Sequence, residues 1–487
     1  MPSIVFVSAF LDLGEDRSKD KSVETCFQHF SALAKTGAKI HLYLSHCYQK
    51  QYETICKNPP NVLVDYIELS QLETYREIQD LYPHLPEVRT PHHDTRAFMT
   101  LMNAKAELVA RAMGFEPGFC ASSENYGWTA KHFAWIDFSI FHVFRQPYET
   151  AEYITMLSRT RFRDSCMLVP GCWGQGMNRY SLFEKVNWRF CGGFFLGSAS
   201  RILELNTLYR THWRNIVAEK GLTWEVNMMA HFELEGWKPE WFHADHNDTI
   251  VRVPPHSIPV VASLTTIPSR VENCLAAIDS LLPQVDHVYL SVCSTYKRFD
   301  QAWETPPELT KEPYASKVTV VVSEDYGPAT KYIGAATQIP PHSWTFVCDD
   351  DQIYHPTLIS RMRNNLESYG IYQNHYEAIR QKTSGGLIHG YVGLLVNSAE
   401  LLGLKRFPLP DVARFVDDQW MSIYCFKQGL TIRPSKIENY RDIFAKLDSW
   451  HELIGPDSLA GLNNRADMVR AMEEVFGVKF NGANITQ

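Results

Sequence analysis

The chain has 487 residues, which is long for one hydrophobic core, so two or three domains are expected. Hydrophobic residues make up 45% of it and charged residues 21%, both ordinary values for a globular protein. The formal net charge of −8 argues against a nucleic acid or an anionic membrane as partner. No apolar window approaches the roughly 18 residues of a membrane-spanning helix, so we predict no transmembrane segment.

The cysteines and the N-terminus indicate a cytoplasmic location. Eleven cysteines are scattered without a CxxC pair, and several stand inside apolar segments, such as Cys166, Cys191 and Cys348. This distribution is typical of reduced, buried thiols. The apolar run near the N-terminus has no basic residue before it, so it does not read as a signal peptide.

The first half alternates predicted strands and helices. Residues 3–10, 40–44 and 61–67 read as strands, and a helix with an apolar face at Val23, Phe27 and Phe30 follows the first of them. Such alternation predicts an α/β domain with a mostly parallel sheet. The same theme of apolar segments that end in polar residues continues at 133–138, 167–173, 187–197, 224–227 and 241–248.

A proline-rich stretch separates this half from a second α/β pattern. Residues 253–258 form a predicted stiff linker between domains at 1–252 and 259–487. Beyond the linker, Ser269 is the expected N-cap of a helix whose apolar positions end at Leu281. The predicted strands of this half are 260–264, 287–292, 317–322 and 344–348.

The most informative stretch is residues 344–354, WTFVCDDDQIY, a buried strand followed by three aspartates. Adjacent carboxylates at a strand end repel one another and resist desolvation unless a cation lies there. Asp349 and Asp351 are two residues apart and could bind one hard cation, Mn²⁺ or Mg²⁺. The alternative is a solvated acidic loop that caps the next helix.

Two other segments carry groups that suit a nucleotide and its phosphates. TTIPSR at 265–270 stands at the carboxyl end of a predicted strand, where open α/β sheets bind ligands. DYGPATKY at 325–332 offers a carboxylate and a lysine, although a solvated lysine at a helix start explains the latter equally well. The candidate contacts to the nucleotide part of a substrate are Thr265, Thr266, Arg270, Asp325, Lys331 and Asp350.

Residues 415–429, FVDDQWMSIYCFKQG, place two acids at the start of an apolar helix. The first, Asp417, is the expected N-cap, and the second, Asp418, then projects from the first turn and is the candidate general base. Favourable interaction with the helix dipole is the structural alternative. The candidate acceptor contacts are Trp420 in this helix and His389 and Tyr391 in the glycine-rich segment 385–395.

Residues 3–250 resemble the HtrL/YibB family of bacterial glycosyltransferases. The resemblance rests on IVFVSAF, HDT with MNAK, FAWIDFSIFHVF, VNWRFCGGFFLG, WEVN and HADHND. It implies a GT-A fold in which the strand-end Asp137 binds a metal, and Glu225 is a candidate catalytic residue. His243 and His246, which stand near Asp245 and Asp248, could supply an imidazole to such a cation, or could simply be polar surface residues. Ser139 stands where the second acid of a D-x-D pair is expected.

Residues 258–445 resemble a GT-A glycosyltransferase domain of the family 2 type. TTIPSR, DYGPATK, the triple aspartate and the final acid pair occur in that family's order. The resemblance implies that Asp418 is the base and that Asp349 and Asp351 hold the metal. The predicted fold class is α/β, with two GT-A-like domains, each a mostly parallel mixed sheet flanked by helices.

The predicted function is a bifunctional transfer of hexosyl or pentosyl groups from nucleotide-diphospho-sugars to a glycan or glycolipid-type acceptor, with Mn²⁺ or Mg²⁺. One alternative is that only the second domain is catalytic and the first binds glycan, which the incomplete Asp137-x-Ser139 pair favours. Another is a metal-dependent phosphohydrolase or nucleotidyltransferase, since aspartates at strand ends serve those reactions too.

Overall fold

The computed structural model describes residues 4–14, 22–114, 130–160, 162–163, 165–175, 181–340, 343–366, 371–373, 387–437, 439–445, 465–481 and 484–486. The chain divides into two compact units, Met1–Pro254 and Pro255–Gln487. The division falls inside the predicted linker. Each unit is described by itself below.

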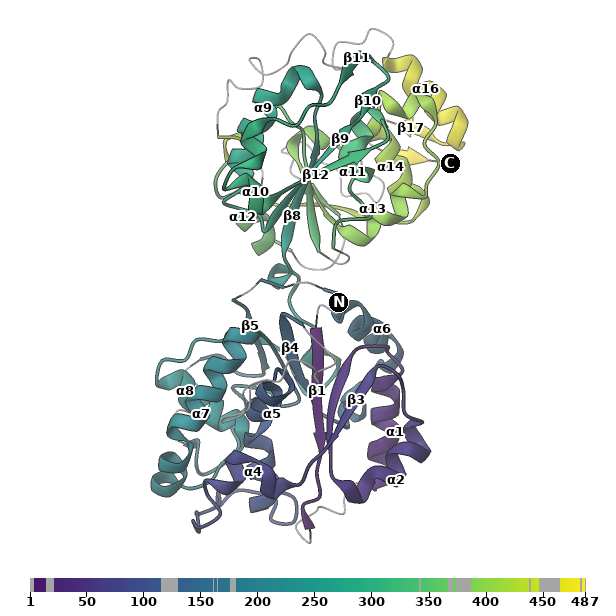
Figure 1. Cartoon of the computed structure of the whole chain (residues 1–487). Coiled ribbons are helices and arrows are strands. Elements are labelled where there is room, and N and C mark those ends of the chain that lie inside the picture. Colours follow the sequence, from purple (N-terminus) through teal and green to yellow (C-terminus); the bar gives the residue numbers. More distant parts are fainter. Residues whose placement is uncertain are drawn as a thin grey trace. The chain divides into compact units, whose positions relative to one another are not determined.

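The N-terminal unit is built on a seven-stranded mixed sheet with strand order β3-β2-β1-β4-β6-β5-β7 (Figure 1). β6 runs antiparallel to its neighbours β4 and β5, and the other pairs are parallel. The parallel pairs bring the carboxyl ends of β1, β2, β3 and β4 to one edge, where open sheets bind ligands. The strands are β1 (Ile4–Phe10), β2 (Ile40–Leu44), β3 (Val62–Tyr66), β4 (His132–Ile136), β5 (Met167–Gly171), β6 (Phe194–Ser198) and β7 (Glu240–His243).

Helices cover both faces of this sheet (Figure 1). α1 (Val23–Ala34) buries its predicted apolar face, and its N-cap Ser22 accepts a hydrogen bond from the backbone of Thr25. The WEVN segment, which the sequence grouped with the apolar strand-like segments, instead supplies the N-cap Trp224 and the first residues of helix α8, which is buried at every position from Glu225 to Phe232. The other helices are α2 (Gln49–Gln51), α3 (Glu73–Arg76), α4 (Arg96–Asn103), α5 (Lys105–Ala112), α6 (Pro147–Leu157), α7 (Ala199–Lys220) and α8 (Glu225–Leu234).

The C-terminal unit has a second seven-stranded sheet, in the order β12-β9-β8-β13-β15-β14-β16. β15 is antiparallel to β13 and β14, and the remaining pairs are parallel. The strands are β8 (Val260–Thr265), β9 (His287–Cys293), β12 (Val318–Ser323), β13 (Trp344–Val347), β14 (Ile371–Gln373), β15 (Leu394–Asn397) and β16 (Ile432–Pro434). Two hairpins join β10 (Thr295–Tyr296) with β11 (Phe299–Ala302) and β17 (Lys479–Asn481) with β18 (Asn484–Thr486).

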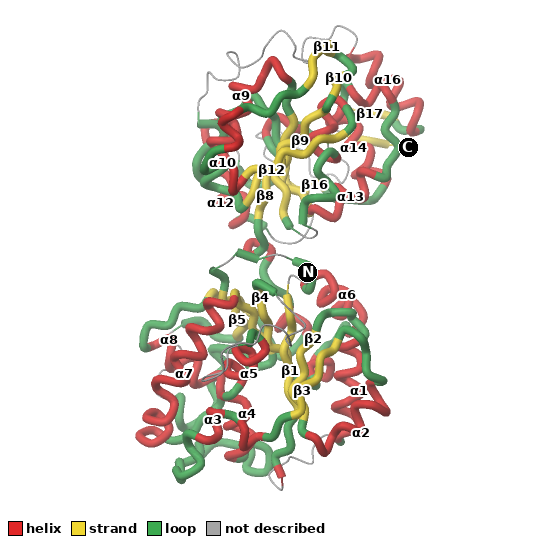
Figure 2. Tube along the Cα trace, viewed as in Figure 1, coloured by secondary structure: helices red, strands yellow, loops and turns green. Residues whose placement is uncertain are grey.

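The helices of this unit also flank the sheet on both faces (Figure 2). α9 starts at Val271 after a 3-10 turn, Pro268–Arg270, so Arg270 rather than the predicted Ser269 occupies the N-cap position. Pro268 fixes the backbone of this turn and moves the helix start forward. The helices are α9 (Val271–Leu281), α10 (Tyr314–Lys317), α11 (Thr330–Ile333), α12 (Leu358–Asn364), α13 (Ser398–Lys405), α14 (Asp417–Lys427) and α16 (Arg465–Phe476).

The two units have the same topology. Numbered along the chain, the strands of both sheets follow the order 3-2-1-4-6-5-7, with the same parallel and antiparallel pairs. The predicted α/β class with two mixed sheets flanked by helices is therefore confirmed. Within the described part of the chain, no helix combines the length and the apolar character that crossing a membrane requires.

Candidate active site

A buried lysine lies at the centre of the C-terminal unit's strand-end site. Lys331 Nζ, on α11, lies 2.7 Å from Asp349 Oδ1 and 2.9 Å from Asp417 Oδ2, and the lysine side chain is only 4% exposed. Burial by itself lowers the pKa of Lys331, but the two carboxylates outweigh burial and raise this pKa well above its ordinary value. The lysine therefore stays charged and joins α11, the end of β13 and the start of α14.

This geometry changes the predicted roles of two residues. Lys331 was expected to contact a phosphate, but its ammonium is buried between carboxylates. Asp417 was expected to cap α14, but it is the first helical residue, Val416 is at the N-cap, and no side chain caps the helix. Asp417 is placed by its ion pair with Lys331, an interaction between residues 86 positions apart that local helix rules do not describe.

Asp418, the next residue of α14, has a different environment. Its Oδ1 accepts a 3.3 Å hydrogen bond from the hydroxyl of Tyr332, and its side chain keeps some exposure to solvent. Burial first, and then the neighbouring charge of Asp417, raise the pKa of Asp418 to about 7. A carboxyl group that titrates near neutral pH can accept a proton from a substrate hydroxyl, as a general base must.

The triple aspartate is held by residues from the end of β8 and the turn after it. Thr266 Oγ1 donates to Asp350 Oδ2 at 2.6 Å, and Arg270 Nη1 lies 3.3 Å from Asp350 and 3.4 Å from Asp351. Two of the predicted nucleotide contacts, Thr266 and Arg270, thus both contact a third, Asp350. Asp350 is only 6% exposed, so its role here is to anchor the strand end.

Arg270 keeps one unused donor. Its buried Nε has no hydrogen-bond partner among the described residues. Buried guanidinium donors are normally satisfied, and an orphaned one beside carboxylates marks a place where an anionic ligand group can bind.

The charge balance of this site fits a divalent cation. Two cations, Lys331 and Arg270, face five carboxyl groups, those of Asp349, Asp350, Asp351, Asp417 and Asp418. Burial, together with the charges of Asp349 and Asp350, raises the pKa of Asp351 to about 7. Carboxylate oxygens are the donors that Mg²⁺ or Mn²⁺ prefers. Among the described residues, however, the donors that lie mutually within 4.8 Å are those of Cys172, Cys191 and His246, and not these carboxylates.

The other predicted ligand contacts of this unit have partners within the protein. The Thr265 hydroxyl donates to the backbone oxygen of Ser291, and Asp325 accepts from the amides of Lys297 and Gly327, so both stabilise turns beside the site. The rings of His389 and Tyr391 meet edge to face, with centroids 6.2 Å apart. Trp420, predicted to touch the acceptor, is fully buried and donates to the backbone of Pro408, because its face of α14 packs into the core.

The N-terminal unit contains a corresponding buried lysine. Lys105 Nζ lies 2.7 Å from Glu225 Oε1, 3.1 Å from Asp137 Oδ1 and 2.8 Å from the backbone oxygen of Gly192. Burial lowers the pKa of Lys105, and the charges of Asp137 and Glu225 more than reverse this. Sequence reasoning missed Lys105; its signal was a lysine inside a run of apolar residues, which can be buried only against carboxylates.

Strand register shows that the two lysine sites correspond. His132 pairs with Ile4 and Ser198, as Trp344 pairs with Val260 and Asn397. Five positions beyond these paired residues stand Asp137 and Asp349. The second acid is the first residue of its helix in both units, Glu225 in α8 and Asp417 in α14.

The same register shows what the N-terminal site lacks. Phe138 stands in the place of Asp350, and Phe10 stands in the place of Thr266. The N-terminal unit therefore has two stacked rings, with centroids 4.5 Å apart, where the C-terminal unit has a hydrogen bond from a hydroxyl to a carboxylate. The residue after Glu225 is the buried Val226, where the C-terminal unit has Asp418. The N-terminal site therefore has the buried ion pairs without the additional acids.

His243, predicted as a metal ligand, is exposed on β7, with its ring against Trp241. Among the described residues, the group of His, Cys, Asp or Glu donors that lie mutually within 4.8 Å contains His246 instead, with Cys172 and Cys191. His243 is the last residue of β7, whereas His246 lies on the loop after this strand, beside Cys172 and Cys191.

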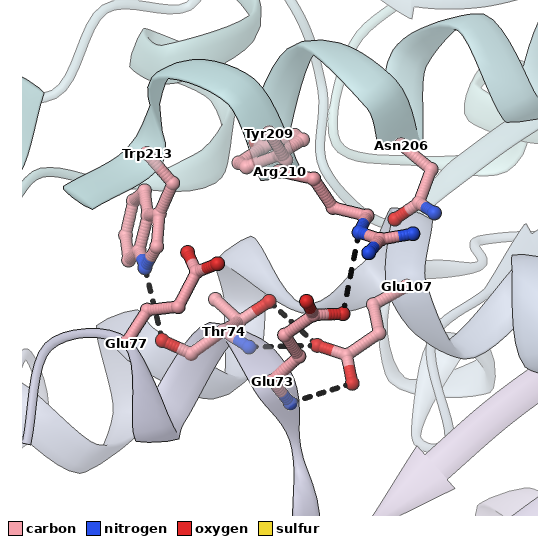
Figure 3. A pocket seen from close by; sticks show the side chains of 8 residues that line it. All are labelled: Glu73, Thr74, Glu77, Glu107, Asn206, Tyr209, Arg210 and Trp213. Atoms are coloured by element: carbon pink, nitrogen blue, oxygen red, sulfur yellow. Dashed lines mark hydrogen bonds and ion pairs between the residues drawn. The ribbon is translucent and has the colours of Figure 1, made fainter. Parts of the chain in front are cut away.

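A small polar pocket opens between α3, α5 and α7 of the N-terminal unit (Figure 3). Its central carboxylate, Glu107, accepts hydrogen bonds from the amides of Glu73 and Thr74 and from the Thr74 hydroxyl. Trp213 donates to the backbone oxygen of Thr74. These bonds satisfy the first turn of α3, so the pocket is explained by helix packing.

Comparison with known proteins gives fold similarities only. No family model matches the chain, and no curated protein matches it. Among solved structures, mouse xyloside xylosyltransferase 1 in its apo form is similar at a TM-score of 0.28 and 8% identity, over 49% of this chain and 84% of that one. The galactosyltransferase LgtC, in complex with donor and acceptor sugar analogues, is similar at 0.27 and 8%, over 55% and 77%.

A third similar structure is the 4-diphosphocytidyl-2C-methyl-D-erythritol synthase of Anaerococcus prevotii, at a TM-score of 0.25 and 7% identity, over 50% of this chain and 89% of that one. At such scores these similarities carry no argument about function. The functional proposal therefore rests on the residues of the site.

Proposed function

We propose that the C-terminal unit transfers a hexosyl or pentosyl group from a nucleotide-diphospho-sugar to a hydroxyl group of a glycan or glycolipid-type acceptor. The observation that carries this proposal is the pair of acids at the start of α14. Asp417 is neutralised by Lys331, whereas the pKa of Asp418 is raised to about 7. Neighbouring carboxyls with such different environments are typical of a divided structural and catalytic role.

In this reaction Asp418 takes the proton of the acceptor hydroxyl as its oxygen attacks the anomeric carbon. The bond from that carbon to the diphosphate breaks, and the diphosphate leaves with the electron pair. The unpartnered Nε of Arg270 is available to an anionic oxygen of the donor. A divalent cation bound by Asp349 and Asp351 would neutralise the charge that builds up on the leaving diphosphate.

The test is a screen of the full-length protein against nucleotide-sugars with Mn²⁺, first by thermal shift and then by product formation. A donor at 100 times its Kd should stabilise the protein by about 2.7 kcal/mol. Asp418→Asn should lower turnover by about 10²-fold or more while the donor-induced shift persists. Asp411→Asn, an exposed acid ahead of the same helix, is the matched control and should keep normal turnover. An active Asp418→Asn enzyme would contradict the proposal.

A phosphohydrolase or nucleotidyltransferase would use the same acids differently. Without an acceptor, a transferase leaves most of the nucleotide-sugar intact, whereas a phosphohydrolase releases monophosphate at once. Rapid release of monophosphate without any acceptor, lost in Asp349→Asn, would therefore favour the hydrolase over the transferase.

For the N-terminal unit we propose glycan binding without turnover, in preference to a second transferase. Ser139 and Val226, which stand in the places of Asp351 and Asp418, favour this alternative, because they remove the second metal ligand and the base. Asp137→Asn and Glu225→Gln should then weaken acceptor binding. Turnover by the C-terminal unit should stay close to normal when the acceptor concentration is saturating. A separate transfer activity that either variant abolishes would instead support the bifunctional hypothesis.

A further inference from the structure

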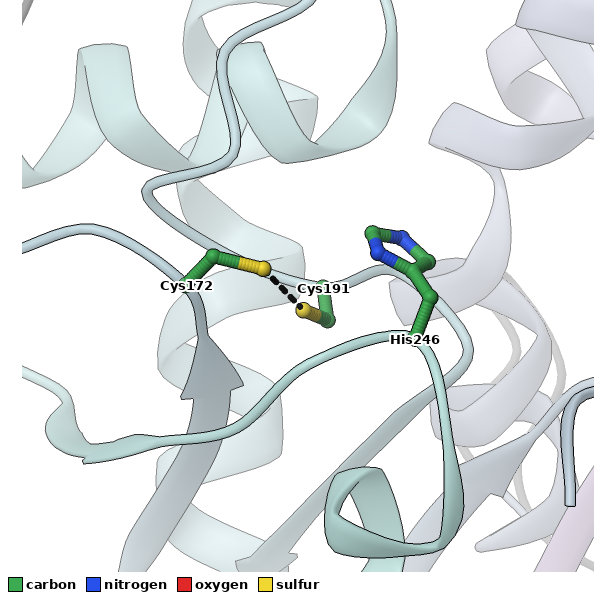
Figure 4. Close-up of side chains that lie close together, drawn as sticks. All are labelled: Cys172, Cys191 and His246. Carbon is green, nitrogen blue, oxygen red and sulfur yellow. Dashed lines mark hydrogen bonds between the residues drawn. The ribbon is translucent and has the colours of Figure 1, made fainter. Parts of the chain in front are cut away.

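Three chemically distinctive side chains outside the proposed active site meet at one edge of the N-terminal sheet. Cys172 directly follows β5, Cys191 lies shortly before β6, and His246 lies on the loop after β7. These strands are neighbours in the sheet order β6-β5-β7. The side chains therefore come from three segments and converge on one point (Figure 4).

The backbone holds both thiols in place. The amide of Cys172 donates to the oxygen of Trp188 at 3.0 Å, and the amide of Cys191 donates to the oxygen of Pro170 at 2.8 Å. Gly171 permits this close crossing, since a Cβ there would lie 1.9 Å from the backbone oxygen of Arg189. The site is thus formed by strand ends and close backbone packing.

The distance between the sulfurs suits one shared metal ion. Cys172 Sγ and Cys191 Sγ are 3.6 Å apart. Two thiolates, each about 2.3 Å from a tetrahedral Zn²⁺, lie about 3.8 Å from one another. A disulfide would need about 2.05 Å, and in the absence of an ion the same spacing is that of a hydrogen bond between two reduced thiols.

A fourth donor stands beside the other three. Asp245 Oδ1 lies 3.8 Å from Cys172 Sγ and 3.8 Å from His246 Nδ1. The His246 ring also rests against the Trp188 ring, at 4.3 Å between centroids, which limits where the imidazole can turn. The two sulfurs and the imidazole lie mutually within 4.8 Å, and the carboxylate of Asp245, which now accepts the amide of His246, is the nearby oxygen that can complete a tetrahedral set.

We propose that Cys172, Cys191, His246 and Asp245 bind one Zn²⁺ ion in a closed, structural site. Thiolate and imidazole donors select zinc over the hard Mg²⁺ and Mn²⁺ that suit the carboxylates of the C-terminal unit. The ion would link the loop that follows β7, through Asp245 and His246, to Cys172 at the end of β5. This site is independent of the proposed glycosyl transfer.

The test uses the full-length protein, reduced and stripped of metal with a chelator. One equivalent of zinc should bind, excess Mn²⁺ should not displace it, and the melting temperature should rise. Cobalt in place of zinc should give the charge-transfer absorption of thiolate ligands. Cys172→Ser and His246→Ala should each weaken zinc binding at least tenfold, because even outer-shell changes at metal sites cost about 10–100-fold.

Matched variants separate this site from others. The exposed Cys47 and His243 offer a thiol and an imidazole elsewhere, so Cys47→Ser and His243→Ala should keep zinc affinity. Asp349→Asn should also keep it. His246 is exposed, so His246→Ala should preserve native circular dichroism, which separates loss of a ligand from loss of fold. Absence of stoichiometric zinc binding, unchanged affinity in His246→Ala and Cys172→Ser, or loss of zinc in Asp349→Asn would overturn the proposal.

Discussion

The pKa of Asp418 depends on burial and on the charges of neighbouring side chains. Burial and the adjacent Asp417 raise its pKa to about 7, while Lys331 acts in the opposite direction. Because a general base works in its deprotonated form, kcat/KM for glycosyl transfer should rise with pH and level off above about 7.

Asp417→Asn should move the midpoint of this pH profile, the pH at which kcat/KM is half its plateau value, to lower pH. The substitution removes a like charge beside Asp418 and leaves Lys331 less neutralised, and both changes favour the charged carboxylate. The measurement is kcat/KM across the pH range for both enzymes. The exposed Asp411→Asn serves as a control and should keep the original midpoint. An unmoved midpoint in Asp417→Asn would mean that another group controls the profile.

The buried lysines support the structure in both units. Lys331→Met should destabilise the C-terminal unit by about 3–5 kcal/mol, because it leaves Asp349 and Asp417 as uncompensated charges. Lys105→Met should act in the same way on the N-terminal unit through Glu225 and Asp137. Denaturant unfolding of the two variants measures both effects.

The free energy of unfolding should fall by less than the sum of the two single losses when a carboxylate partner is removed together with its lysine. The double variant Lys331→Met with Asp417→Asn should be less destabilised than the sum of the single changes, since contacting residues couple. Additive losses would argue that the ion pair contributes little to folding.

At the scale of the elements, the short 3-10 helix Gly390–Val392 passes close to the start of α14. A Cβ at Gly390 would lie 2.5 Å from Asp418 Oδ1 and 2.8 Å from the Tyr332 hydroxyl. Gly192 has the corresponding role in the N-terminal unit, where a Cβ would lie 2.0 Å from Glu225 Oε1. Glycine at both positions lets a strand-end segment approach the first turn of a helix.

Gly390→Ala should therefore lower turnover by about 10²-fold, the cost of misplacing a catalytic group by about 1 Å. The lysine–aspartate pairs should keep the unit folded. Gly174→Ala, at a glycine with open space around it, is the matched control and should leave turnover unchanged. Normal turnover of Gly390→Ala would show that Asp418 tolerates displacement, which a general base should not.

At the scale of the whole molecule, each unit has its own sheet and its own core. One buried cluster contains only residues before Pro254, and another contains only residues after Pro255. Residues 1–254 and 255–487 should accordingly fold as separate fragments. Each should be soluble and melt cooperatively by circular dichroism. Two insoluble fragments that become soluble only when co-expressed would point to one interdependent structure.

The local sequence was enough to predict many of the strands and some of the helices, but not α7, which has 22 residues. The strand at Ile40–Leu44 and the apolar face of α1 followed from residue type and period, because both depend on neighbours within a few positions. The strand end that carries Asp349, and Asp418 just inside a helix, were found in the same way.

Tertiary structure decided which charges meet. Lys331 lies 18 positions from Asp349 and 86 from Asp417, so no local pattern shows that its ammonium is buried between them. The same reason explains why Trp420 belongs to the core and why His246 rather than His243 joins the cysteines. Burial and partners of a polar side chain depend on elements distant in sequence, and at these sites they determine protonation, and with it the chemistry that the residues can perform.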